Sequence, residues 1–127
     1  NLENNVKLTG KVPYKSIGNY LENAGIFLFP SLADAASAAL LEAISFGLIT
    51  IAFNKNGSQD IVSNKLGILI EYNNLDKIVE DFANAIYQVN NNDVLRDYFY
   101  KNLETYTREN SAAITGQIYK VIYNSLL

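Results

Sequence analysis

The stretch from Ile26 to Phe53 constrains the fold of this chain more than any other part of the sequence. It opens with the apolar run Ile26–Phe29, which is too short for a helix and rich in residues that favour strands. Pro30 ends this run, because proline cannot donate to a strand ladder. Apolar and small residues at helical spacing follow over 37–46, and a second apolar run occupies 48–53. Strand, helix and strand with short links predict a βαβ unit with two parallel strands.

The loop after the first of these strands is where a ligand is expected, because parallel α/β sheets bind ligands beyond the carboxyl ends of their strands. Ser37 can cap the helix that follows. The free N–H groups of its first turn and the helix dipole favour an anion such as a phosphate. Asp34 precedes the helix and Glu42 lies eight residues later. Carboxylates repel phosphate but accept hydrogen bonds from hydroxyl groups, so the sequence predicts an anion at the helix start and a polyol held by two acids.

Each of these polar residues also has a simpler interpretation. Asp34 could be only a turn residue or a favourable charge at a helix N-terminus. Glu42 could be a solvated residue on a helix surface, and Lys11 a solvated charge. The spacing of the two acids is therefore a weak signal when it is taken without its surroundings.

Composition excludes several classes of function. The chain has 127 residues, no cysteine and no histidine, which excludes disulfides, thiolate metal sites, Ser-His triads and an imidazole base. The lack of cysteine fits a reducing compartment such as the cytoplasm. A net charge of −3 argues against a nucleic-acid surface, and the 10 basic residues are scattered. The sequence holds no apolar run long enough to cross a membrane.

The rest of the chain alternates strand-like and helix-like segments around the central unit. Further strands are predicted at Val6–Thr9 and Leu66–Glu71, and helices at Lys15–Asn23, Ser58–Val62, Asn74–Val89, Asp93–Tyr106 and Ser111–Leu126. This order predicts an α/β fold with a small, Rossmann-like parallel sheet flanked by helices, and closing helices at the C-terminus.

The central residues also form a pattern that resembles a known family. A strand ends in Pro30-Ser31, an acid follows at Asp34, seven residues later comes Glu42-Ala43, and Gly47 precedes the next strand. This pattern is similar to that of the C-terminal, donor-binding domain of GT-B glycosyltransferases of the retaining family 4, or group 1, type. The flanking segments VKLTGKV, NGSQDIV and GILIE resemble neighbouring parts of the same domain.

The sequence departs from that family pattern in three places. Asp34 stands where the family usually has glutamate. Ala35-Ala36-Ser37 stands where the family commonly has a glycine-rich sequence, and Ile49 stands where it often has proline. Glycine allows the backbone to approach a phosphate closely, whereas alanine and serine allow it only where φ stays negative.

The resemblance implies a hexosyltransferase that transfers a sugar from a UDP- or GDP-sugar donor, with retention of configuration, to a glycan or lipid-linked acceptor. Glu42 would accept hydrogen bonds from the ribose hydroxyls, and Asp34 would position the transferred sugar. The full set of implied donor-binding residues is Lys11 and Val12 near the base, Asp34, Glu42, and the backbone N–H groups of Ala36, Ser37 and Ala38 facing the diphosphate. The resemblance implies neither a metal nor another cofactor, because the helix start and basic side chains would neutralise the phosphates.

The resemblance also implies how the domain is used. Residues 1–127 would form a single nucleotide-sugar-binding domain within a larger enzyme, without the N-terminal acceptor domain and the first two strands of the C-terminal domain. The fragment alone would be inactive, and the full-length enzyme would associate peripherally with the inner face of the membrane. Two other classes remain open, namely a non-catalytic nucleotide-sugar- or glycan-binding module and a flavodoxin-like domain for protein interaction.

Overall fold

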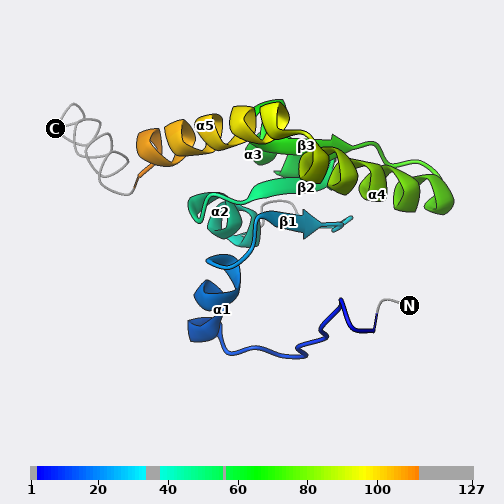
Figure 1. Ribbon diagram of the computed structural model, residues 1–127, viewed down its shortest axis with the longest axis horizontal. Helices are drawn as coiled ribbons and strands as arrows, with labels where there is room; N and C mark the ends of the chain where they lie inside the picture. Colours follow the sequence, from blue (N-terminus) through cyan, green and yellow to red (C-terminus); the bar gives the residue numbers. More distant parts are fainter. Residues whose placement is uncertain (1–2, 34–37, 56, 112–127) are drawn as a thin grey trace, which may run out of the picture.

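A three-stranded parallel sheet with strand order β1-β2-β3 forms the centre of the protein (Figure 1). The computed structural model describes residues 3–33, 38–55 and 57–111. The strands are β1 (Ile26–Phe29), β2 (Ile49–Phe53) and β3 (Gly67–Ile70), and both pairings are parallel. The predicted α/β class and the predicted βαβ unit are therefore confirmed.

The middle strand β2 is the most buried element, and all five of its residues are shielded from solvent. It pairs with β1 through Ile26↔Ile49 and with β3 through Thr50↔Gly67. A strand that is covered on both faces needs apolar side chains on both, which explains the unbroken ITIAF sequence.

Helices cover both faces of the sheet. The connecting helices α2 (Ala38–Ser45) and α3 (Gly57–Leu66) share one apolar cluster with alternate strand residues, and the long helices α4 (Leu75–Asn91) and α5 (Asp93–Glu109) share another. The first cluster contains Leu40, Ala52 and Val62 with Phe27, Phe29 and Leu69 packed against it. The second includes Ile49, Ile51, Phe53, Ile78, Val89, Phe99 and Leu103. The two sets follow from the alternation of strand side chains between the faces.

Helix α1 (Tyr14–Leu21) lies against α2, close to the start of β1 (Figure 1). Its buried Leu21 packs with Ala43 and Leu48, and the partly buried Ile17 completes this contact. Adding a Cβ to Gly18 would place it 3.5 Å from the Phe46 ring, so the two helices are already in close contact at that point. This packing fixes the N-terminal end of α1 relative to α2.

The predicted strand at Val6–Thr9 is wrong. The segment has no regular structure, and Leu8 is 93% exposed. Figure 1 shows it running apart from β1, so no described strand lies beside it. An alternating sequence becomes a strand only where its N–H and C=O groups find a ladder partner, and this one has none among the described residues.

The predicted helices are confirmed with shifted ends. The helix predicted at Ser58–Val62 continues to Leu66, but it is interrupted at Ser63, whose φ of 42° and ψ of 166° are not helical. Helix α4 begins after Asn74, whose side chain accepts a hydrogen bond from the Lys77 N–H. The helix predicted at Ser111–Leu126 lies outside the described residues except for Ser111.

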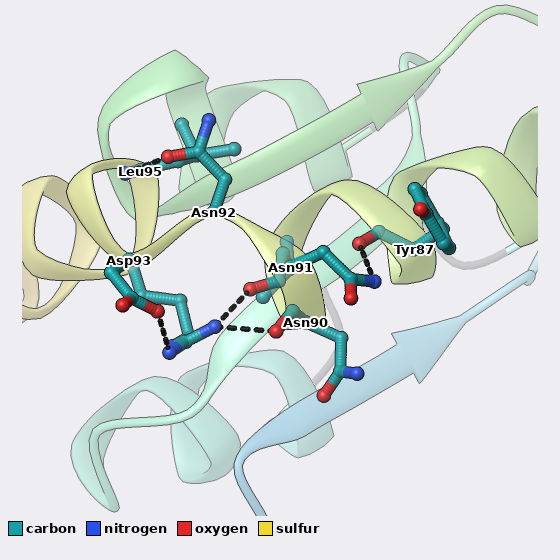
Figure 2. A network of polar contacts seen from close by, with 8 residues as sticks. Tyr87, Asn90, Asn91, Asn92, Asp93 and Leu95 are labelled. Atoms are coloured by element: carbon teal, nitrogen blue, oxygen red, sulfur yellow. Dashed lines mark hydrogen bonds and ion pairs between the residues drawn. The ribbon is translucent and has the colours of Figure 1, made fainter.

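A polar network joins α4 to α5 at a sharp junction (Figure 2). The Arg96 guanidinium donates to the carbonyl oxygens of Val89, at 3.0 Å, and Asn90, at 2.6 Å, and it forms an ion pair with Asp93. These carbonyls belong to the last turn of α4, where helical partners are missing and the dipole favours a cation. Asn92 caps the next helix, because its side-chain oxygen accepts a hydrogen bond from the Leu95 N–H at 3.0 Å.

We expect Asn92→Ala to lower the free energy of unfolding by about 1 kcal/mol, because α5 loses its N-terminal cap. Asn90→Ala is the matched control, since the Asn90 side chain makes no cap hydrogen bond. Urea unfolding followed by circular dichroism measures both changes. Equal losses for the two variants would show that the cap does not stabilise the junction.

Candidate functional site

The candidate site is built around Glu42, which lies one turn into α2 and is half-buried. Its Oε1 accepts a hydrogen bond of 2.8 Å from the hydroxyl of Tyr14, the first residue of α1. The two residues are 28 positions apart in sequence. The packing of Leu21 against Ala43 holds their helices together and so brings them into reach.

Sequence reasoning placed Glu42 on this helix correctly but missed Tyr14. Tyr14 follows Pro13 and was expected to belong to a loop, whereas Pro13 occupies the N-cap position and Tyr14 begins the helix. Proline directly before a helix is a usable signal for a helix start. No local pattern, however, indicates a contact between residues so far apart in the chain.

The contact changes the acidity of Tyr14. The hydrogen bond to Glu42, the negative charge of that carboxylate and a small contribution from burial all raise the pKa of the Tyr14 hydroxyl. Ionised Tyr14 would lose a donated hydrogen bond and would face a like charge, so the protonated donor is favoured.

We expect Glu42→Ala to lower the pKa of Tyr14 towards the ordinary phenol value of about 10. Since the folded-state pKa is raised, the contact contributes to stability at pH values below that ordinary value and is lost as the pH rises through the folded-state pKa. NMR of the Tyr14 ring Cζ, followed over roughly pH 8 to 12, gives the midpoint. An unchanged midpoint in the variant would contradict the hydrogen bond.

The other predicted binding residues are only partly described. Ala38 is the first residue of α2, one turn before Glu42. Lys11 is exposed and Val12 half-buried on the segment that leads into α1, and no hydrogen bond joins either of them to Glu42 in the described part of the chain. Asp34, Ala36 and Ser37 lie outside the described residues, so their assigned roles stay predictions.

A polar group also forms at the carboxyl edge of the sheet, where β2 and β3 end. The Asn54 side chain donates to Glu71 Oε1 at 2.5 Å, and its backbone N–H donates to the Ile70 carbonyl at 2.8 Å. Lys55 Nζ lies 5.1 Å from the centroid of the Tyr72 ring, within range of a cation–π interaction. The sequence predicted a polar turn after β2 but did not predict these pairings.

Two surface hollows lie away from Glu42. An apolar groove of about 570 Å³ is lined by residues of β1, the end of β2 and α4, including Leu28, Phe53 and Phe82. A more polar hollow of about 420 Å³ runs between β3 and α4, with Lys77 and Asp81 among its lining residues. Neither hollow is lined by Glu42 or Tyr14. The site around Glu42 is therefore identified by its acid and its helix rather than by a described cavity.

The arrangement defines a class of protein. A parallel sheet has helices on both faces, and α2 begins beyond the carboxyl end of β1 and carries an acid one turn inside. This is part of a Rossmann-like domain, the architecture that places ligands at the carboxyl edge of its strands.

Comparison with known proteins specifies the family. The family model described as "Glycosyl transferases group 1" matches residues 1–106, and the chain belongs to this family. The resemblance stated from the sequence is therefore confirmed.

Similar proteins include several sugar transferases. The chain is 40% identical over 80 residues to the UDP-Gal:alpha-D-GlcNAc-diphosphoundecaprenol alpha-1,3-galactosyltransferase of Escherichia coli, covering 62% of this chain and 20% of that protein. It is 29% identical over 120 residues to one of the subunits of the phosphatidylinositol N-acetylglucosaminyltransferase of Homo sapiens, covering 93% and 25%. A third relative, the 2-deoxystreptamine N-acetyl-D-glucosaminyltransferase of Niallia circulans, is 34% identical over 64 residues, covering 50% and 16%. The chain thus spans between 16% and 25% of the length of these relatives.

Two further findings concern the described residues alone. None of their helices is both long and apolar enough to cross a membrane. Nor do three or more acidic side chains among them gather closely enough to hold a metal ion.

Proposed function

We propose that this chain is the donor-binding domain of a retaining hexosyltransferase that uses a UDP- or GDP-sugar. The observation that carries the proposal is the position of Glu42, held one turn into the helix that begins at the carboxyl edge of a parallel sheet, in a chain of the group 1 family. A carboxylate in this position suits hydroxyl groups of a ligand whose anionic part lies at the helix start.

Each predicted residue has a role in this proposal. Glu42 accepts hydrogen bonds from the ribose hydroxyls, and Ala38, together with Ala36 and Ser37, directs backbone N–H groups at the diphosphate. Lys11 and Val12 lie against the base. Asp34 positions the transferred sugar. The partial positive charge of the α2 N-terminus and basic side chains offset the phosphate charge, so the donor needs no metal ion in this proposal.

The reaction exchanges one bond at the anomeric carbon of the sugar. The bond to the diphosphate oxygen breaks, and a bond to the acceptor hydroxyl forms on the same face. The acceptor proton passes to the departing phosphate. This step depends on a positioned leaving group more than on a protein base, which agrees with a chain that has no histidine.

The relatives support the choice of donor and acceptor. The name of the E. coli relative gives UDP-Gal as its donor and a diphosphoundecaprenol-linked sugar as its acceptor. We propose a glycan or lipid-linked acceptor here as well, bound mainly by parts of a longer protein outside these residues. We place the enzyme in the cytoplasm, at the inner face of the membrane where such acceptors are exposed.

Titration of the isotope-labelled chain with UDP, GDP and ADP and their glucose conjugates tests the proposal. We expect one nucleotide to shift backbone amide signals from Ala36 to Glu42 and to leave those of α4 unchanged. Weak binding is consistent with the proposal if the shifts saturate and stay local. No shift at millimolar nucleotide, in this chain and in a full-length protein that contains it, would overturn the proposal.

A non-catalytic binding module is the second candidate, and the sequence Ala35-Ala36-Ser37 favours it. Alanine and serine restrict the close approach to phosphate that glycine allows. Such a module would give the same amide shifts but would never transfer the sugar, even within a full-length protein. A transfer assay with a labelled nucleotide sugar separates the two candidates.

A further inference from the structure

The contact between Tyr14 and Glu42 has a geometry that the proposed donor site can use. The Tyr14 hydroxyl donates to Oε1 of Glu42 at 2.8 Å, while the side chain of Tyr14 remains 74% exposed. A tyrosine so exposed adds little to the core. Its hydroxyl is nevertheless directed at one particular oxygen of the candidate ligand-binding acid.

The position of Tyr14 is fixed by the fold rather than by a loop. It is the first residue of α1, directly after the N-cap Pro13, and the Ser16 N–H donates to the Pro13 carbonyl at 2.9 Å. Helix α1 is held on α2 by the cluster of Leu21, Ala43 and Leu48. The hydroxyl therefore meets Glu42 from a preorganised element.

A carboxylate can accept about four hydrogen bonds, two at each oxygen. Tyr14 uses one acceptor position on Oε1 and leaves Oε2 and the second position on Oε1 for a ligand. Two neighbouring hydroxyls, as in a ribose, need two acceptors at a fixed spacing. A free glutamate side chain samples several rotamers, and fixing them costs entropy when a ligand binds.

We propose that Tyr14 is a positioning residue that holds the Glu42 carboxylate in the orientation that accepts a vicinal diol. The inference rests on the proposed function, because it takes the ribose of a nucleotide as the ligand. Tyr14 acts through Glu42 and is not assigned any contact with the reacting atoms.

Tyr14→Phe removes only the hydroxyl, and Tyr20→Phe is the matched control. Tyr20 lies on the same helix, is 48% exposed, and makes no hydrogen bond to Glu42. Each variant is titrated with UDP and 2′-deoxy-UDP, or with GDP and 2′-deoxy-GDP where guanine is the preferred base. The deoxy nucleotide lacks one hydroxyl of the diol and so reports whether the effect passes through Glu42.

We expect Tyr14→Phe to raise the Kd for the ribonucleotide about 3- to 10-fold, which corresponds to the loss of one hydrogen bond. The Kd for the 2′-deoxy nucleotide should change much less, and Tyr20→Phe should change neither. Tighter ribonucleotide binding by Tyr14→Phe would show that Tyr14 blocks the acid. Equal weakening for both nucleotides would show a merely structural role, and either result would overturn the inference.

A measurement without ligand separates this inference from the proposed function. The carboxyl ¹³Cδ signal of Glu42 should shift in Tyr14→Phe and stay in place in Tyr20→Phe. A shift without any nucleotide binding would retain the contact but remove the proposed function and the positioning role together. Binding of the ribonucleotide that is unaffected by Tyr14→Phe would leave the proposed function in place and remove only the role of Tyr14.

Discussion

Gly67→Ala is expected to destabilise the protein by about 3 kcal/mol or more, because a methyl group does not fit between β2 and β3. A Cβ at this position would lie 1.8 Å from the carbonyl oxygen of Thr50 and 2.7 Å from its carbonyl carbon. Both atoms belong to the backbone of the buried central strand, where Thr50 is the register partner of Gly67. The strands would have to move apart at the start of β3, which would disturb their hydrogen bonds.

Gly25→Ala is the matched control for this prediction. A Cβ there would have the Tyr100 hydroxyl as its nearest neighbour, at 3.8 Å, which is an ordinary contact distance. The free energy of unfolding of both variants can be measured with urea, and Gly25→Ala should stay within about 0.5 kcal/mol of the native chain. Equal stability of the two variants would mean that β3 does not approach β2 as closely as described.

The sequence predicted the centre of the fold because that part carries a strong pattern. Short apolar runs predicted β1 and β2, and the 3.6-residue apolar period predicted α4 and α5. Gly67 shows the limit of such patterns. The sequence placed it at a strand, but the close approach of Thr50 comes from the pairing of two segments and has no local signal.

The errors have the same physical origin. Val6–Thr9 has the alternation of a strand, yet pairing decides whether a strand forms, and no described strand lies beside it. The break of α3 at Ser63 puts a non-glycine residue at positive φ, which propensity disfavours and only the tertiary fold can impose. At the site, Glu42 followed from helical spacing, whereas its partner Tyr14 depended on how α1 packs on α2.

Glu42→Ala is expected to weaken nucleotide binding about 10- to 100-fold, which is the range for losing hydrogen bonds to a charged group. The loss should be large for UDP or GDP and small for the 2′-deoxy forms, because the carboxylate is assigned to the ribose diol. Isothermal titration calorimetry or amide NMR shifts measure the affinity. The variant should fold normally, since Tyr14 is exposed and its freed hydroxyl can donate to water.

Glu80→Ala is the control for charge alone, because Glu80 is an exposed acid on α4, a helix on the other face of the sheet. Removing either acid changes the net charge of −3 by the same amount, so a general electrostatic effect on an anionic nucleotide would strengthen binding in both variants. Removal of a specific acceptor weakens binding only in Glu42→Ala. Stronger binding in both variants would identify Glu42 as a solvated surface charge, and the polyol would then have to be held elsewhere at the carboxyl edge of the sheet.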